Sequence, residues 1–316
     1  MNNPRLRLLA CATALLFLPS MAAAEIRVVA SVKPIHSLVS AVMNGIGAPG
    51  LIVEGAASPH TYSLKPSNAS ALQGADVVFW VGHGLEAFLE KPLEALAGKA
   101  KVVALEDAPG LEKLAFREGG AFDAHDHADD EGGKPAEEHD EEDHGGTDMH
   151  LWLDPMNAKA MATEIEQTLV AADPANAERY RANGQALRQE IDALDKEIAR
   201  MVAPVADRPS VVFHDAYQYF ESRYKVRIVG SITVSPETMP GAERIAEIHA
   251  KVQELKAACV FAEPQFEPKL IAVVTEGTDA KSGTLDPAGG ALEAGPALYP
   301  ELMRNLARSF VDCLAK

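Results

Sequence analysis

The chain has 316 residues, with 46 Asp and Glu against 29 Lys and Arg, and its formal net charge at pH 7 is −17. This acidity argues against a nucleic-acid-binding protein, because phosphates require a basic surface, and it is compatible with a cationic ligand. The length suggests two domains, each able to bury a hydrophobic core of its own.

The first 24 residues are predicted to be a signal peptide. Arg5 and Arg7 form a basic start, the apolar run LLACATALLFLPS follows, and residues 22–24 are three alanines that suit cleavage. The apolar run is too short to span a bilayer comfortably, and the sequence contains no other long apolar run. We therefore expect residues 1–24 to be removed, leaving a soluble, exported protein that begins at Glu25.

Short runs rich in β-branched residues alternate with helical patterns twice along the rest of the chain. Buried strands of the parallel type are predicted, in chain order, at residues 26–32, 50–55, 76–82, 101–107, 210–216, 225–231, 259–264 and 283–287. Helices are predicted between and after them at residues 36–45, 67–75, 85–98, 217–224, 243–258, 267–277 and 296–315. This alternation indicates an α/β protein in which helices cover both faces of parallel sheets.

Mostly helical sequence from residue 157 to residue 202 joins the two halves. Pro174 follows Asp173 and suits the first turn of a new helix, and a helical pattern then continues to Val202 over roughly 40 Å at 1.5 Å per residue. We expect two (β/α) lobes with parallel-type sheets, joined by a long rigid linker helix. The predicted bounds are 25–156 for the N-terminal lobe, 157–203 for the helical linker and 204–316 for the C-terminal lobe.

Residues 122–148 form an acidic segment within the N-terminal lobe that has no hydrophobic periodicity. The segment contains 12 acidic residues, one lysine and four histidines, namely His125, His127, His139 and His144. Because such a composition cannot bury enough apolar surface, we expect a disordered insertion. Its histidines lack a rigid setting, so they favour an accessory, weakly binding metal loop over a plain acidic linker, and they do not form the main site.

Four potential metal ligands lie where predicted strands meet loops. They are His60 after the second strand, His150 at the start of HLWLDP, His214 at the end of SVVF, and Asp286 in GTLDP. HLWLDP is itself predicted to be a short strand. Side chains at such strand ends converge on a crevice in α/β folds. Three imidazoles and one carboxylate suit a tetrahedral zinc site, whereas a manganese site would be expected to have more oxygen ligands.

Four motifs, SPHTYSLKPS, HLWLDP, FHDAYQYF and GTLDP, give the chain a resemblance to a known family. In this order and spacing they resemble the cluster A-I solute-binding proteins of metal ABC importers. The acidic histidine-rich segment and the pair Cys259 and Cys313 make the chain similar to the zinc-specific group of that family. The resemblance covers essentially the whole mature chain. It implies two (β/α) lobes joined by a long helix, a metal buried between them, and delivery of that metal to a membrane permease.

The resemblance also implies the ligands. It assigns zinc to His60, His150 and His214, and position 214 is a carboxylate in manganese-binding relatives. Among zinc-binding members the fourth ligand varies between a carboxylate beside the first histidine, water, and the aspartate of the LDP motif. Because Pro59 stands beside His60, this leaves Asp286 or water.

Two cysteines, Cys259 and Cys313, remain in the mature chain. In an oxidising compartment an even pair is typical of a disulfide, and the alternative is two buried free thiols. A bond would tie the final predicted helix to a strand much earlier in the chain and stabilise the fold by roughly 4 kcal/mol.

These observations predict a periplasmic protein that captures Zn²⁺ and delivers it to the permease of a zinc ABC importer, as a monomer and without nucleic acid. A manganese or iron carrier of the same fold is the first alternative. A secreted zinc hydrolase is the second, but no HExxH motif supplies a general base. Glu263 is interpreted instead as a strand-end side chain that faces solvent or caps a helix. We therefore expect a carrier and not an enzyme.

The remaining histidines of the lobes and both tryptophans are given structural roles. We expect His36 and His83 to be structural or solvated, and His249 to lie at the surface of a charged helix. Trp80 and Trp152 are expected to pack inside strands. The sequence GHGLEA superficially matches a dinucleotide-binding turn, but it does not follow the first strand. We interpret it as a tight strand-to-helix turn.

Overall fold

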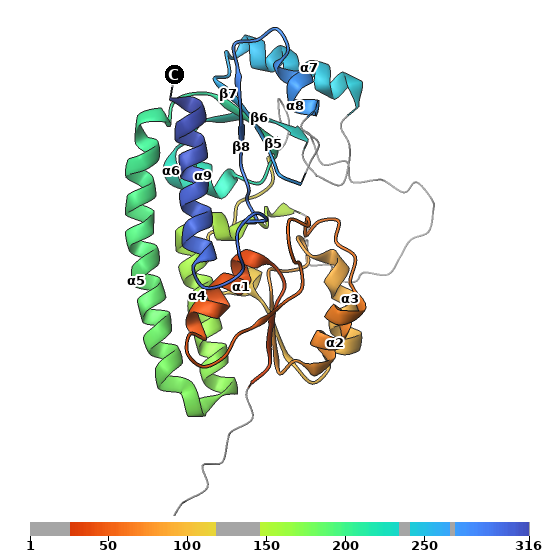
Figure 1. Cartoon of the computed structure of the whole chain (residues 1–316), viewed down its shortest axis with the longest axis vertical. Helices are drawn as coiled ribbons and strands as arrows, with labels where there is room; N and C mark the ends of the chain where they lie inside the picture. Colours follow the sequence, from red (N-terminus) through yellow and green to blue (C-terminus); the bar gives the residue numbers. More distant parts are fainter. Residues whose placement is uncertain (1–25, 118–145, 234–240, 266–268, 316) are drawn as a thin grey trace, which may run out of the picture.

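The computed structural model describes residues 26–117, 146–233, 241–265 and 269–315. The predicted signal peptide and the four histidines of the acidic segment lie outside these residues. The described chain forms two α/β lobes, one above the other in Figure 1, with long helices along one side of both. In this part of the chain, no helix has the length and apolar character needed to cross a membrane.

The N-terminal lobe contains a four-stranded parallel sheet in the order β2-β1-β3-β4. Its strands are β1 (Val28–Ala30), β2 (Gly50–Leu51), β3 (Val77–Trp80) and β4 (Lys101–Ala104). Its helices are α1 (Lys33–Val42), α2 (Pro66–Gly74) and α3 (Glu90–Leu96), with 3₁₀ turns at Ala87–Leu89 and Leu105–Asp107. All four residues of β3, including Trp80, are buried, as expected for a parallel sheet with both faces covered.

The C-terminal lobe repeats this plan with a parallel sheet in the order β6-β5-β7-β8. Its strands are β5 (Ser210–His214), β6 (Ile228–Thr233), β7 (Cys259–Ala262) and β8 (Lys281–Thr284). Its helices are α6 (Gln218–Tyr224), α7 (Ala242–Glu254), α8 (Lys269–Thr275) and α9 (Leu298–Leu314). Alternation along β5 places Val211 and Phe213 in a small core with α7 and α8, and Val212 in the main core on the opposite face. His214 shares the face of Val212, which is the side of the main core.

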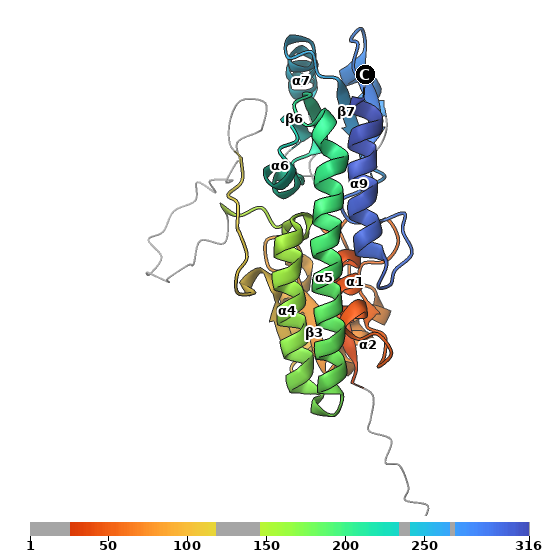
Figure 2. The ribbon, with the colours of Figure 1, turned by 90° about the vertical axis from the view of Figure 1, so that its left-hand side faces the viewer.

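Two long helices join the lobes. They are α4 (Pro155–Ala172) and α5 (Ala177–Val202), with 3₁₀ turns at Pro174–Asn176 and Ala203–Val205. In Figure 2, α5 runs beside α4 along the N-terminal lobe and continues beside α9 along the C-terminal lobe. Its 26 residues span about 40 Å, and Arg304 on α9 donates to Glu197 on α5 at 3.0–3.1 Å. The predicted α/β class, the two parallel-sheet lobes and the long linker helix are confirmed.

The segment HLWLDP differs from its prediction as a strand. Leu151–Leu153 form a 3₁₀ turn, and α4 begins directly afterwards, with the Asp154 side chain accepting the Met156 N–H at 2.9 Å. Aspartate followed by proline is a strong helix-start signal, because the carboxylate caps the first turn and proline fits its first position. Trp152 is buried as predicted, but in this turn and not in a strand.

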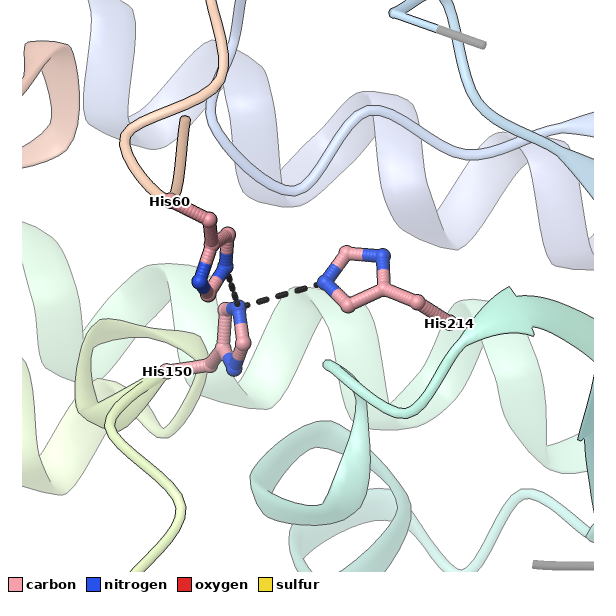
Figure 3. A group of neighbouring side chains, drawn as sticks. All are labelled: His60, His150 and His214. Carbon is pink, nitrogen blue, oxygen red and sulfur yellow. Dashed lines mark hydrogen bonds between the residues drawn. The ribbon is translucent and has the colours of Figure 1, made fainter. Parts of the chain in front are cut away.

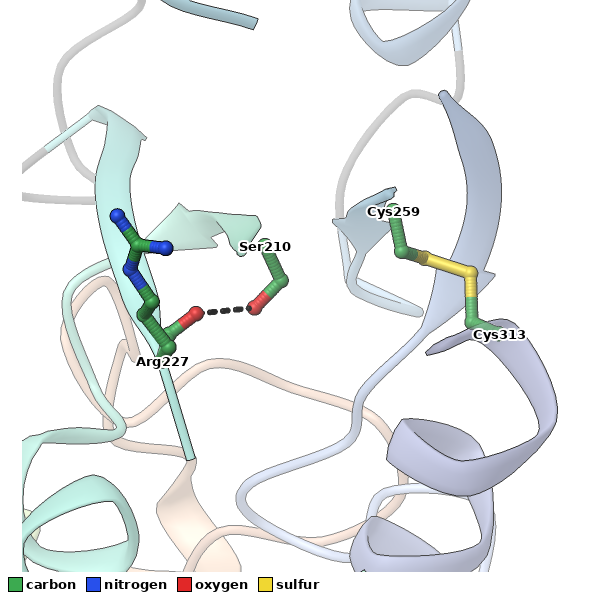
Figure 4. The surroundings of a disulfide bond; sticks show 4 residues. All are labelled: Ser210, Arg227, Cys259 and Cys313. Carbon is green, nitrogen blue, oxygen red and sulfur yellow. Dashed lines mark hydrogen bonds between the residues drawn. A yellow bond between two sulfur atoms is a disulfide. The ribbon is translucent and has the colours of Figure 1, made fainter. Parts of the chain in front are cut away.

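The two cysteines form a disulfide, so the predicted bond is confirmed (Figure 4). Cys259 begins β7 and Cys313 lies in the last turn of α9, with Cα atoms 5.9 Å apart. The sequence separation of 54 residues corresponds to about 4 kcal/mol in the chain-entropy description. Beside the bond in Figure 4, the Ser210 hydroxyl donates to the Arg227 carbonyl at 3.2 Å and fixes the start of β5. The disulfide thus holds α9 to the C-terminal sheet.

Candidate metal centre

Three histidine side chains, His60, His150 and His214, meet between the two lobes (Figure 3). We call them the histidine cluster. The Nε2 atom of His150 lies 3.3 Å from the Nε2 atoms of both other rings, and the three candidate ligand atoms all lie within 4.8 Å of one another. Ligand atoms about 2.0–2.1 Å from a tetrahedral zinc are about 3.3–3.4 Å from each other. The two short distances therefore match two edges of such a tetrahedron.

Different parts of the fold supply the three side chains. His60 comes from the loop after β2, His150 directly precedes the 3₁₀ turn at Leu151–Leu153, and His214 is the last residue of β5. His150 and His214 are buried, and His60 is half-buried. Two side chains thus belong to the N-terminal lobe and one to the C-terminal lobe, so an ion bound by all three would connect the lobes.

Asp148 orients His150. Its Oδ1 accepts both the ring Nδ1–H of His150 at 2.7 Å and the backbone N–H at 3.0 Å. Asp148 is fully buried, and contacts from the other lobe hold it in place: Gln218 donates to Oδ2 at 3.3 Å, and the Tyr219 hydroxyl donates to the backbone oxygen at 2.7 Å. Asp148 was predicted to belong to the disordered acidic segment, and for this residue the prediction was wrong. A carboxylate two positions before a ligand histidine was the available signal.

Glu263 orients His214 in the same way. Its Oε1 accepts the ring Nδ1–H of His214 at 2.6 Å and the hydroxyl of Tyr217 at 3.1 Å. Glu263 is only 3% exposed, so the interpretation of a solvent-facing side chain was wrong. Burial and the Glu263 charge together raise the pKa of Tyr217 well above its usual value, which keeps this hydroxyl a donor. Both carboxylates fix their imidazoles with Nδ1 protonated, so that the lone pair of Nε2 points into the cluster.

Burial and neighbouring charges shift the pKa values of two cluster histidines in opposite directions. For His60, burial lowers the pKa well below its usual value, and the two neighbouring imidazoles lower it further. For His214, burial also acts to lower the pKa, but the Glu263 carboxylate together with the charges of Asp148 and Asp215 outweighs it, so the pKa is raised. His60 therefore offers a neutral ring at neutral pH, whereas a metal has to displace a proton that His214 holds more strongly.

The fourth predicted ligand, Asp286, does not join the cluster. Its carboxylate accepts the backbone N–H groups of Gly290 and Ala291 at 3.0 and 3.1 Å. The Nζ of Lys33 donates to three carbonyl oxygens of the same turn at 2.8–3.3 Å. Asp286 thus shapes a backbone turn, and among the described residues the group suited to a metal consists of the three histidines alone.

The other histidines of the lobes have partners of their own. A ring nitrogen of His36 lies 3.1 Å from the Pro49 carbonyl, and one of His83 lies 3.2 Å from Glu106 Oε1. On α7, a ring nitrogen of His249 lies 3.0 Å from the carbonyl of a residue on α8. The contacts of His36 and His83 agree with the structural roles predicted for them, whereas His249, predicted to lie at the surface, is half-buried.

The acidic segment joins the fold next to the histidine cluster. Ala115, shortly before the segment, and Thr147, near its end, form an antiparallel bridge. Arg117 forms a bidentate ion pair with Asp215, the neighbour of His214, with one contact at 3.0 Å. The described residues before the segment are therefore fixed to its last residues and to the surroundings of the cluster.

The chain matches the family ZnuA, described as zinc-uptake complex component A periplasmic, over residues 28–313. Two relatives in sequence are high-affinity zinc uptake system proteins ZnuA. The protein of Brucella suis biovar 1 (strain 1330) is 51% identical over 94% of both chains. The protein of Yersinia pestis is 37% identical over 99% of both chains.

Solved structures share the two-lobed fold. A crystal structure of ZnuA has a TM-score of 0.71 at 22% identity and covers 90% of this chain and 99% of that chain. The periplasmic zinc binding protein TroA from Treponema pallidum has a TM-score of 0.76 at 22% identity and covers 92% and 100%. At this level of identity the likeness concerns the fold. The family match and the relatives in sequence show that this chain belongs to the family of periplasmic A components of zinc-uptake complexes.

Proposed function

We propose that this protein binds Zn²⁺ at the histidine cluster in the periplasm and delivers it to the membrane permease of a zinc ABC importer. The observation that carries this proposal is the pair of 3.3 Å distances between Nε2 atoms, which suit tetrahedral zinc. His150 and His214 are held by carboxylates at Nδ1, which leaves their Nε2 atoms ready to bind. Membership of the zinc-uptake family supports the same cargo and the same partner.

Two buried carboxylates balance the charge of the cargo. A zinc ion that enters the cluster loses its hydration, and a buried charge is tolerated only beside an opposite charge. Asp148 and Glu263 are both buried and each contacts a cluster histidine. Their negative charges compensate the two positive charges of the ion, although neither carboxylate is itself a ligand.

The ligand set favours zinc over manganese or iron. Imidazole nitrogen suits zinc, whereas manganese prefers carboxylate, carbonyl and water oxygens. In the part of the chain that the structure describes, the metal-binding group contains no carboxylate.

The surroundings of the cluster also favour a carrier over a zinc hydrolase. A hydrolase needs a general base within reach of the metal-bound water. Glu263 instead contacts the Nδ1 edge of His214, away from the Nε2 that faces the cluster. We therefore propose a carrier that is not an enzyme, and that acts as a monomer without nucleic acid.

Each predicted part of the chain would have a role in this function. Residues 1–24 would direct export, and the lobes at 25–156 and 204–316 would enclose the ion, held apart by the linker at 157–203. The acidic segment at 122–148, with its four histidines, would be an accessory loop that concentrates zinc near the cluster, since many carboxylates attract cations. The ends of this segment beside the cluster support that role.

Metal binding by the purified mature protein tests the proposal. Metal-free protein should take up one tightly bound zinc in competition with a chelating dye, and the loaded protein should show no hydrolytic turnover. Alanine at any one cluster position should weaken binding by orders of magnitude, while the control His249→Ala on α7 should not. Wild-type affinity in a cluster variant would remove that histidine from the site, and metal-dependent turnover would favour the hydrolase.

A further inference from the structure

The histidine cluster supplies three corners of a tetrahedron, and the fourth corner needs a ligand of its own. Asp286 is occupied by the N–H groups of its own turn. Glu263 contacts the outer nitrogen of His214, and position 59, next to His60, is a proline without a side-chain donor. Among the described residues, no carboxylate lies with the three ring nitrogens. The acidic side chains that the structure describes therefore leave the fourth corner open.

A small cavity of about 20 Å³ adjoins the cluster. Its walls include all three histidines together with Ser58, Gln265 and Glu263, whose Oε1 is hydrogen-bonded to the outer nitrogen of His214. The ion itself would lie between the ring nitrogens, about 2.0–2.1 Å from each. A cavity of this volume has room for one water molecule. The space next to the ion thus suits a single small ligand.

Gln265 places an acceptor at this cavity. Its side-chain Oε1 is buried and has no hydrogen-bond partner among the described residues, a condition that folded proteins generally avoid. The turn that Lys33 holds lies close by, because a Cβ added at Gly290 would be 3.5 Å from Gln265 Nε2 and 2.9 Å from Ala56 Cα. A metal-bound water has two hydrogens to donate, and a bond to Gln265 would satisfy this oxygen.

The family resemblance leaves water as the fourth ligand once Asp286 is set aside, and we propose that Gln265 positions this water by accepting a hydrogen bond from it. The inference deepens the proposed function, on which it rests, by completing the coordination of the same site. Gln265 acts through the water and is a positioning residue. Its neutral amide leaves three nitrogens and one water around the ion, a set that favours zinc and cobalt over manganese.

Gln265→Met tests this directly, since methionine keeps the length of the side chain and removes the strong oxygen acceptor. Zinc affinity should fall about tenfold, as for other partners of metal ligands. With Co²⁺ as the probe, the visible absorption bands should shift relative to the wild type, because they report the geometry and ligands of the ion. The matched control Gln253→Met, on the exposed side of α7, should change neither property.

Gln265→Glu provides a second, independent measurement. The carboxylate keeps an acceptor for the water and adds a charged oxygen, which manganese prefers. The ratio of zinc affinity to manganese affinity should therefore fall about tenfold, while the variant still binds zinc. An unchanged cobalt spectrum and zinc affinity in Gln265→Met, or an unchanged metal preference in Gln265→Glu, would overturn the role of Gln265. Failure of the wild-type protein to bind one zinc would instead overturn the proposed function, so the two failures are distinguishable.

Discussion

Replacing Glu263 by glutamine should weaken zinc binding about tenfold without unfolding the protein. The carboxylate accepts the Nδ1–H of His214 at 2.6 Å and the hydroxyl of Tyr217 at 3.1 Å. The amide introduced by this substitution keeps one oxygen acceptor, so the hydrogen bonds can persist, but the negative charge is lost. The variant Glu263→Gln therefore isolates the contribution of charge to the orientation and basicity of His214.

The magnitude follows from the two kinds of hydrogen bond. A hydrogen bond to a charged group contributes about 1.5–3 kcal/mol and a neutral one about 0.5–1.5 kcal/mol, so the difference is about 1–1.5 kcal/mol. Since 1.4 kcal/mol is a factor of ten in affinity, the dissociation constant should rise about tenfold. Glu263→Leu should have a larger effect, because it removes both acceptors and leaves the buried Tyr217 hydroxyl unpaired, which costs about 1–3 kcal/mol of unfolding free energy.

Competition with a chelating dye measures the affinity, and thermal unfolding of the metal-free protein measures the stability. Tyr217→Phe is the matched control, because it removes the second hydrogen bond and leaves the charge beside His214 in place. Its zinc affinity should stay close to that of the wild type. If Glu263→Gln bound zinc as tightly as the wild type, the carboxylate would have no role at the metal, and the reasoning from the His214 contact would be refuted.

Three further predictions concern the same site. Asp286→Asn should keep wild-type zinc affinity in the dye competition, because Asp286 holds a backbone turn and not the metal. The substitution should lower the unfolding free energy by about 1 kcal/mol, and a large loss of affinity would place Asp286 among the ligands. Zinc affinity should fall as the pH decreases through the raised pKa of His214, since the ion displaces that proton, and titrations showing equal affinity in mildly alkaline and mildly acidic buffer would contradict this. Deleting residues 123–144 should remove weak additional sites in calorimetry and slow zinc capture at low ionic strength, yet leave one tight site, whose disappearance would move the main site to the acidic segment.

The fold was largely predictable from the sequence because its signals are local. The β-branched runs that became β1 and β3 are buried on both faces and need no partner to be recognised. The helical pattern of α5 is likewise continuous in sequence. HLWLDP was mispredicted because its apolar residues suggested a strand, whereas the Asp154 cap and the following proline determine a turn into a helix.

The candidate site was predictable only in part. The cluster histidines could be located because each lies near a strand end or a recognisable motif. The partners of their outer nitrogens could not, since the contact of His214 with Glu263 joins residues 49 positions apart. Asp148 is buried because Gln218 and Tyr219 of the other lobe contact it. Composition alone does not reveal these contacts, so Asp148 was predicted to belong to the acidic segment.

We expect zinc release from this arrangement to need no wide opening of the lobes. The linker helix α5 continues through both lobes, and the turn after Asp286 is attached to the N-terminal lobe by Lys33 and by Trp152, whose Nε1 donates to Pro287 O at 2.8 Å. His214 lies outside this attached turn, at the end of β5. Metal–nitrogen distances tolerate departures of only about 0.2 Å. A shift of β5 by about 1 Å relative to His150 would therefore break the tetrahedron, and we expect docking on the permease to need a movement of that order to free the ion.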